Sequence, residues 1–377
     1  MAAAGPVPSG RDDRRVPVVL LTGFLGAGKT TLLNHLLGLP EFARTAVLIN
    51  EFGAVGVDHH LVDKIDETLL VLDSGCICCS VQGDLVRALK NLFARAARRE
   101  IGPVDRVLIE TTGMADPAPV IHTLTEDAFI GDRFRCDGVV TAVDATHGGG
   151  QIDAHREALR QVVMADRLLI TKCDLAPADE RARLAERLAR LNPGAAQIEV
   201  FHGQPPAGAI ASCGLYDTSA KSPDVALWLG EERALAELGR IQAAAAAPLW
   251  RRSPGVPPAA PRRHDASVTT FVLRFDQPLD WLGFCDGLGL LLEVFGERIL
   301  RIKGLLNIAG DPQPRVVQCV QHVAYPPTSL AAWPDDGPYA DRLSRLVFIV
   351  RELQADAVAD LLGGLAGQPA SIVLASR

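Results

Sequence analysis

Residues Gly23–Thr30 read GFLGAGKT and follow the apolar run 16–21 directly. This is the phosphate-binding loop pattern in its usual place between a strand and a helix, here a helix expected over 31–39. Glycines allow backbone N–H groups to close around phosphate oxygens without an obstructing Cβ. The alternative, a chance glycine-rich turn, does not explain why strand, lysine and helix agree. The residues assigned to the triphosphate are Gly23, Gly26, Ala27, Gly28, Lys29, Thr30 and Thr31.

Within this loop, Lys29 is expected to reach the β- and γ-phosphates, and the hydroxyl of Thr30 is expected to bind Mg²⁺. A second apolar strand, 104–110, ends in Glu110–Thr111–Thr112–Gly113. An acid at the carboxyl end of a strand beside the loop is suited to organise the Mg²⁺ shell and the attacking water. Gly113 is placed to donate its amide to the γ-phosphate. The alternative for Glu110 is a cap on Thr112.

A third strand, 167–170, ends in Thr171–Lys172–Cys173–Asp174, where GTPases hold Asn-Lys-x-Asp. Asp174 can accept two hydrogen bonds from guanine, whereas adenine would leave a buried carboxylate unpaired. Lys172 can lay its stem over the base. Threonine in place of asparagine departs from the pattern, and an N-cap by Asp174 is the structural alternative.

The segment Gly75–Cys79 carries three thiols, Cys76, Cys78 and Cys79, while the other five cysteines are scattered. The N-terminus has no apolar stretch typical of a signal peptide, so we expect a cytoplasmic chain with reduced thiols. Clustered thiolates then indicate a soft metal site for Zn²⁺, Co²⁺ or Cu⁺ with one tetrahedral position open. A buried apolar turn, or a redox pair of Cys76 and Cys79, are the alternatives.

Together these motifs resemble the CobW-type P-loop GTPases, of the CobW/HypB/UreG-like group. The resemblance covers nearly all of the chain and is carried by GFLGAGKTTLLNHLL, NEFGAVGVD (50–58), SGCICCSVQGDL (74–85), IETTGMADPAPV (109–120) and VQHVAYPP (320–327). It implies a GTP-hydrolysing metal chaperone whose CxCC thiols bind the metal. It also implies that GTP binding and hydrolysis switch metal affinity or docking of a client metalloprotein.

Two further acids lie in the expected first switch. Asp58 or Glu51 is expected to join Thr30 at Mg²⁺, and Glu51 is also a candidate to complete the zinc or cobalt shell. The chain departs from many members of the family at Ala54, where they carry an acid, and in its linker, which has only His264. A metal-gathering role for the linker is therefore not supported.

Three classes of function remain open on the sequence. One is the metallochaperone, another is a zinc buffer or sensor in which GTP turnover is incidental, and the third is a small-molecule kinase. Asp174 argues against the kinase, which has no need to recognise guanine. A homodimer that depends on nucleotide or metal also remains open.

Composition agrees with an α/β enzyme. The chain has 377 residues and a formal charge of −7, which argues against a nucleic-acid partner, and no apolar run long enough to cross a membrane. We expect a disordered segment over 1–15, a GTPase domain over 16–230 with a mostly parallel sheet flanked by helices, a helical and Pro-rich linker over 231–265, and a smaller α+β domain over 266–377. Expected strands in the first domain span 16–21, 45–49, 68–72, 104–109, 138–143, 167–170 and 197–200.

The helix expected over 180–191 is amphipathic, and its arginines are expected on a solvated face. In the C-terminal domain we expect strands over 268–275, 316–323 and 345–350 and helices over 279–295 and 355–365. His322 is interpreted as a structural histidine, with a ligand or client contact as the alternative.

Overall fold

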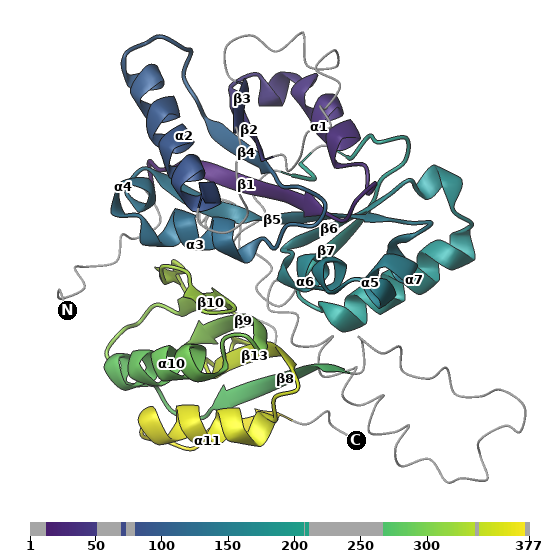
Figure 1. Ribbon diagram of the computed structural model, residues 1–377. Helices are drawn as coiled ribbons and strands as arrows, with labels where there is room; N and C mark the ends of the chain where they lie inside the picture. Colours follow the sequence, from purple (N-terminus) through teal and green to yellow (C-terminus); the bar gives the residue numbers. More distant parts are fainter. Residues whose placement is uncertain are drawn as a thin grey trace, which may run out of the picture. The chain divides into compact units, whose positions relative to one another are not determined.

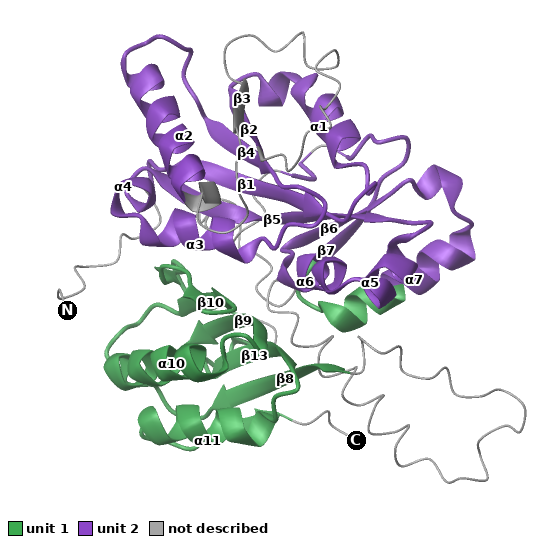
Figure 2. Cartoon of the chain, viewed as in Figure 1, with its two compact units in different colours: residues 1–12, 186–195, 216–377 green, residues 13–185, 196–215 purple. Residues whose placement is uncertain are grey.

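The structure is a computed structural model that describes residues 13–50, 69–72, 80–206, 208–210, 267–335 and 339–373. The chain divides into two compact units (Figure 2). The parallel-sheet unit comprises residues 13–185 and 196–215, and the antiparallel-sheet unit comprises residues 1–12, 186–195 and 216–377.

The parallel-sheet unit is built on seven strands in the order β3-β2-β4-β1-β5-β6-β7 (Figure 1). Every neighbouring pair is parallel. The expectation of a mostly parallel sheet is therefore confirmed. The strands are β1 (Val16–Gly23), β2 (Thr45–Asn50), β3 (Leu69–Leu72), β4 (Arg106–Glu110), β5 (Phe134–Asp144), β6 (Arg167–Thr171) and β7 (Ala196–Glu199).

Helices cover both faces of this sheet, as the burial of β1 on both sides requires. Val19 and Leu21 of β1 share one core cluster with Leu32 and Leu36 of the first helix. Residues of odd number on β5 face the opposite way, and Thr141 there bonds to the sixth helix. The helices are α1 (Lys29–Leu37), α2 (Ser80–Ala97), α3 (Ala118–Glu126), α4 (Ala128–Gly131), α5 (Gly148–Ala154), α6 (Arg156–Met164) and α7 (Ala178–Leu191), with 3₁₀ turns η1 (Pro40–Phe42) and η3 (Cys173–Leu175).

The antiparallel-sheet unit contains a second sheet in the order β11-β10-β9-β13-β8-β14, with β12 paired to β10. Its neighbouring strands are antiparallel. Two helices pack on it and on each other, and their apolar faces share one core with the strands. The elements are β8 (Val268–Phe275), α10 (Trp281–Phe295), β9 (Ile299–Leu306), β10 (Arg315–Val320), β11 (Val323–Ala324), β12 (Thr328–Ser329), β13 (Ser344–Arg351), α11 (Ala355–Leu365) and β14 (Ser371–Val373).

Strand β9 was not predicted from the sequence, although all eight of its residues are buried. Arg301 and Lys303 interrupt its apolar pattern and obscure the signal. These charged side chains are tolerated inside because they have partners: Lys303 donates to the carbonyl of Gly194 at 3.1 Å.

The prediction of one strand over 316–323 is wrong in its second half. β10 ends at Val320, Gln321 adopts a left-handed φ of 50°, and β11 turns back so that Val320 pairs with Val323. His322 lies in this turn, where its Nδ1 is 2.9 Å from the carbonyl oxygen of Leu292 near the end of α10. A Cβ at Gly296 would collide with that imidazole. This contact supports the structural interpretation of His322.

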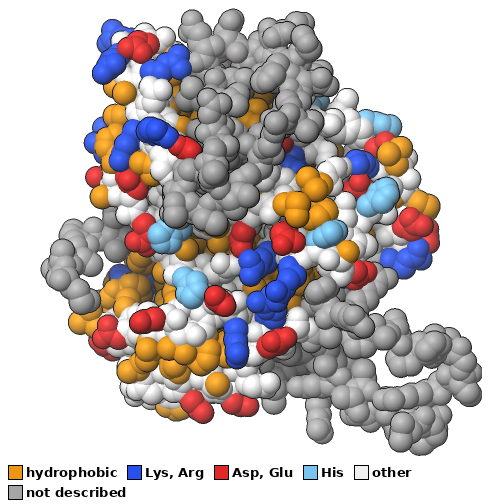
Figure 3. Space-filling model, viewed as in Figure 1, with side chains coloured by type: hydrophobic (Ala, Val, Ile, Leu, Met, Phe, Trp, Pro, Cys, Tyr) orange, Lys and Arg blue, Asp and Glu red, His pale blue; other side chains and the backbone are white. Residues whose placement is uncertain are grey.

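Charged side chains of both signs are interspersed on the face shown in Figure 3. Within the described ranges, no helix has both the length and the apolar character needed to cross a bilayer.

The core of the antiparallel-sheet unit can be tested at Phe348 of β13. This side chain is fully buried, and its ring stacks on Phe271 with 5.1 Å between centroids. We expect Phe348→Ala to lower the free energy of unfolding by about 3–5 kcal/mol, because the cavity cannot close completely. Urea unfolding followed by tryptophan fluorescence measures this. Leu282→Ala on α10, where the side chain is 72% exposed, is the control. Equal losses in the two variants would contradict the assigned core.

Candidate functional site

The motif residues meet at one edge of the parallel sheet, where the strands end. Leu21 pairs with Glu110, Gly23 with Ala142, and Asp144 with Thr171. The loops that follow β1, β4 and β6 therefore begin side by side, although they lie far apart in the sequence. In open parallel sheets, ligands bind at this edge.

The glycine-rich loop requires glycine at specific positions. Gly23 has φ +143°, and a Cβ there would lie 2.4 Å from the carbonyl oxygen of Ala142 on β5. Gly26 and Gly28 have φ values of 72° and 84°, which place them in the left-handed region. Ala27 between them is buried. Helix α1 begins at Lys29, two residues earlier than predicted, because the left-handed Gly28 ends the loop and starts the helix at once.

Lys29, Thr30 and Glu110 form the polar centre of the loop. Lys29 Nζ donates to the carbonyls of Gly23 (2.8 Å) and Phe24 (3.2 Å). Burial lowers the pKa of Lys29, and the Glu110 carboxylate partly opposes this shift. Thr30 Oγ1 donates to Glu110 Oε1 at 3.1 Å. The sequence-predicted phosphate lysine, magnesium hydroxyl and catalytic acid are thus brought together.

This centre fits a magnesium ion by the chemistry of its donors. The hydroxyl of Thr30 and the carboxylate of Glu110 are hard oxygen ligands within reach of each other at the start of a helix. Asp58 and Glu51, the other candidate ligands, lie outside the described residues.

The Glu110–Gly113 loop packs directly on the glycine-rich loop. Thr111 donates its hydroxyl to Thr22 (2.8 Å) and its amide to the carbonyl of Leu21 (3.0 Å). A Cβ at Gly113 would lie 2.7 Å from the backbone nitrogen of Leu25. Only glycine allows this approach, which keeps the Gly113 amide beside the loop expected to hold phosphate.

The Thr171–Asp174 turn is tied to the same centre. Thr171 Oγ1 donates to the carbonyl of Ala27 at 2.8 Å, so the threonine that replaces asparagine still fastens this turn to the glycine-rich loop. Lys172 has φ +57° and donates to Asp144 Oδ2 at 2.6 Å. Asp174 accepts the backbone N–H of His202 at 2.7 Å, and this bond lowers the pKa of Asp174.

Three parts of the site were missed by sequence reasoning. Asp144 ends β5 and holds Lys172, and its strand-end position was the available signal. The turn at His202 and Gly203 follows β7; a Cβ at Gly203 would lie 2.6 Å from Cγ2 of Thr31. No local motif marked this turn.

Arg181 is the third missed part of the site. The expectation that the arginines of α7 are solvated is wrong for Arg181 and for Arg187, which is 5% exposed. The guanidinium of Arg181 donates to the carbonyls of Cys173 (3.0 Å) and Ala176 (3.1 Å). These two bonds draw the charged group against the backbone at and just after the 3₁₀ turn η3.

The three thiols that the sequence predicts to bind a metal belong to the segment 73–79. Cys76, Cys78 and Cys79 lie outside the described residues. Within the described ranges, no three metal-ligating side chains are grouped. Burial raises the pKa of the Cys173 thiol, and it raises that of Cys319 to about 12, so these thiols are poorly suited to become thiolate ligands.

Comparison with known proteins identifies two family matches. Residues 17–199 match the CobW/HypB/UreG nucleotide-binding domain, and residues 268–366 match the C-terminal domain of the cobalamin synthesis protein CobW. The zinc chaperone YjiA of Escherichia coli K12 is 34% identical over 350 residues, which cover 93% of this chain and 98% of that protein.

A further relative and a solved structure agree. The zinc chaperone CobW of Pseudomonas aeruginosa is 30% identical over 388 residues, covering 92% of this chain and 91% of the relative. The crystal structure of Zn(II)-bound YjiA GTPase from E. coli has a TM-score of 0.63 and 32% identity, covering 93% of this chain and 99% of that one.

The Asp144–Lys172 pair makes stability depend on pH. Burial alone would raise the pKa of Asp144, but the hydrogen bonds from Lys172 and Thr146 outweigh this effect, and the pKa is lowered from 3.8. The ionised carboxylate therefore stabilises the fold above about pH 4, and this contribution is lost as the pH falls through the lowered pKa. We expect Asp144→Asn to cost about 1–3 kcal/mol of unfolding free energy at pH 7 and less at acid pH.

Urea unfolding at pH 7 and in acid tests this. Asp105→Asn is the control, since Asp105 forms an exposed ion pair with Arg44 and its loss should cost under about 1 kcal/mol. A pH-independent loss in Asp144→Asn would contradict the argument.

Proposed function

The chain belongs to the CobW/HypB/UreG family and is a P-loop GTPase, and we propose that it is a metallochaperone that couples GTP binding and hydrolysis to the transfer of zinc to a client protein. The observation that carries the proposal is the extent of the similarity. Proteins named zinc chaperones match more than nine-tenths of the chain, through both family domains. Cobalt is the second metal that the thiol ligands would accept.

In the proposed nucleotide site, the amides of Gly23–Thr31 and the ammonium of Lys29 hold the triphosphate of GTP. Thr30 and Glu110 hold Mg²⁺, with Asp58 or Glu51, and the ion, when bound, balances charge on the β- and γ-phosphates. Glu110 orients the attacking water, and Gly113 donates its amide to the γ-phosphate. The contact between Thr30 and Glu110 supports these roles, because it places both groups at the start of α1.

The proposed zinc ligands are Cys76, Cys78 and Cys79, with Glu51 as a candidate fourth. Register on the sheet supports the coupling of this site to the nucleotide. Asn50 at the end of β2 pairs with Leu72 at the end of β3. The segment that leads to Glu51 and the segment that leads to the cysteines therefore start side by side. Ile49, next to Asn50 on β2, pairs directly with Glu110.

Single-turnover hydrolysis of GTP with and without Zn²⁺ tests the coupling. Acceleration or inhibition by the metal supports a chaperone in which the two sites communicate. An unchanged rate would indicate a zinc buffer or sensor with incidental turnover. A protein captured only by the GTP- and zinc-loaded form would identify the client.

Recognition of the base can be tested at Asp174. We expect GTP to bind at least about tenfold more tightly than ATP, because the Asp174 carboxylate pairs with donors that only guanine presents. Asp174→Asn should reduce this preference. Binding of fluorescent GTP and ATP analogues measures it, with Asp179→Asn on α7, whose carboxylate forms an exposed pair with Arg183, as control. A native protein without preference would mean that Asp174 only fastens the turn to His202.

Metal binding can be measured directly. We expect about one tight Zn²⁺ or Co²⁺ per chain, with an affinity that changes between the GTP and GDP states. The affinity should fall as the pH drops toward about 6, because thiolate ligation releases protons. Bound Co²⁺ should give an intense near-ultraviolet charge-transfer band. Serine at Cys76, Cys78 and Cys79 together should abolish the band and the tight site.

Cys285→Ser is the control for this variant, because Cys285 is a half-buried free thiol in the other unit. Metal affinity retained in the triple variant would refute the thiol site. An affinity unaffected by nucleotide would refute the coupling.

A further inference from the structure

Helices α5 and α6 touch both loops that are proposed to hold the γ-phosphate. Gln151 of α5 donates its side-chain amide to the carbonyl of Leu25 at 3.2 Å. The ring of His155, between the two helices, stacks on Phe24 with centroids 4.5 Å apart. Phe24 and Leu25, which receive these contacts, lie between Gly23 and Gly26 in the glycine-rich loop.

The same pair of helices holds the Glu110–Gly113 loop. The side-chain N–H groups of Gln161 on α6 donate to the carbonyl of Gly113 (3.2 Å) and to that of Ala115 (3.0 Å), two residues further along the chain. One residue earlier, Arg160 pairs with Asp116 at 2.8 Å. The loop is thus attached to α6 by consecutive side chains.

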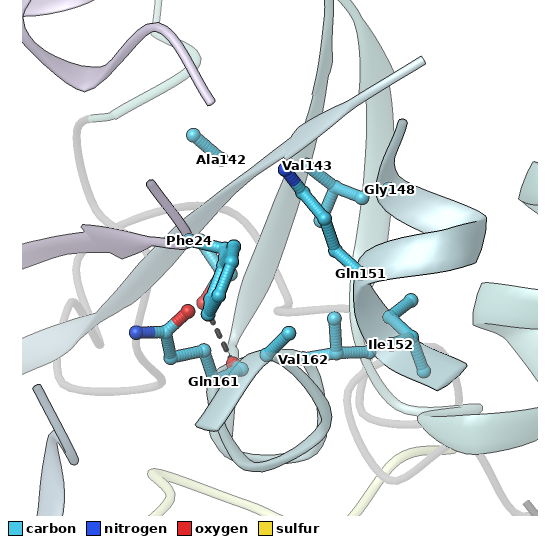
Figure 4. A pocket seen from close by; sticks show the side chains of 10 residues that line it. Phe24, Ala142, Val143, Gly148, Gln151, Ile152, Gln161 and Val162 are labelled. Carbon is cyan, nitrogen blue, oxygen red and sulfur yellow. Dashed lines mark hydrogen bonds between the residues drawn. The ribbon is translucent and has the colours of Figure 1, made fainter. Parts of the chain in front are cut away.

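Gln161 is the buried member of this set. It is 1% exposed, and its backbone carbonyl accepts the hydroxyl of Thr141 on β5 at 2.8 Å, which fixes the helix to the sheet. Figure 4 shows Gln161 and Phe24 on one side of a cavity, with Gln151, Gly148 and Ile152 on the other. The cavity measures about 10 Å³, roughly the space of one water molecule.

The amide oxygen of Gln161 is buried and has no hydrogen-bond partner among the described residues, which costs free energy. An apolar side chain of the same length would fill the space without that cost. The distinctive contribution of glutamine here is therefore the pair of hydrogen bonds from its nitrogen to the loop.

One of those bonds acts on Gly113, the residue proposed to donate its amide to the γ-phosphate. Gly113 lies against the backbone of Leu25, where no Cβ could fit, and its carbonyl accepts a hydrogen bond from Gln161. The peptide unit that follows Gly113 is therefore held by α6, while the residue itself is packed against the glycine-rich loop, so the Gly113 amide is restrained from both neighbours. The direction in which the loop presents its amides depends on both contacts.

We propose that Gln161 is a positioning residue for GTP hydrolysis, which holds the 111–115 loop so that its amides meet the γ-phosphate in the transition state. The inference rests on the proposed role of Gly113 toward GTP. The observed side-chain contacts of Gln161 are to the carbonyls of Gly113 and Ala115. Gln161 acts through the 111–115 loop, whereas GTP binding is maintained by the glycine-rich loop. Loss of Gln161 should therefore lower kcat more than it weakens GTP binding.

The test is Gln161→Met in the full chain, since methionine keeps the length and removes both hydrogen bonds. We expect kcat to fall about tenfold with KM and GDP affinity within about threefold of the native values. Hydrogen exchange of peptides spanning 111–116 should quicken in the GTP-analogue complex, while exchange in β1 and β5 stays unchanged.

Gln197→Met is the matched control. Gln197 also donates its amide to one carbonyl, that of Ala185 at 3.1 Å, but contacts neither loop, so kcat should stay native. Arg160→Gln, at a partly exposed position, is a second variant that keeps the fold and should lower kcat about two- to threefold through the same loop.

Native kcat and native loop exchange in both α6 variants would overturn the proposal. So would an equal fall of kcat in Gln197→Met, which would indicate a general loss of stability. Native protein that hydrolyses GTP but shows no response to zinc would instead refute the proposed chaperone coupling and leave this inference standing.

Discussion

Parallel pairing of β1 with both β4 and β5 is the constraint on which the nucleotide site depends. Parallel strands end at the same edge, so the loops that leave Gly23, Glu110 and Asp144 meet there whatever their separation in the sequence. The close approach of Gly23 to the carbonyl of Ala142 fixes the point at which β1 gives way to the loop. From that point the loop geometry and the start of α1 follow.

Around this edge, side-chain hydrogen bonds join neighbouring segments to one another. Thr171 binds the carbonyl of Ala27, Asp144 binds Lys172, and Gln161 binds the carbonyls of Gly113 and Ala115. Each bond crosses from one strand-end loop or helix to another. A change at the phosphate can therefore alter several loops without a long chain of intermediates, which is the physical basis for the proposed coupling.

Thiol chemistry is divided along the chain. The described cysteines 136, 173 and 319 are buried, and where a shift is resolved, burial raises the pKa, which keeps the thiol protonated. They are suited to packing rather than to metal exchange. A metal cargo that must be loaded and released is therefore assigned by proposal to the clustered cysteines 76, 78 and 79 and to no thiol of the described core.

The sequence by itself determined the phosphate-loop pattern, the parallel sheet and most strand positions, because these depend on local residue types and on hydrophobic period. It also identified Lys29, Thr30 and Glu110, whose proximity the structure bears out, while their roles toward GTP stay predictions. Only the tertiary structure decided the parts played by Asp144, Gln161 and the His202 turn, as well as the buried strand β9. Their contacts join residues 28 to 48 positions apart, and such contacts depend on strand register and helix packing, which no local pattern encodes.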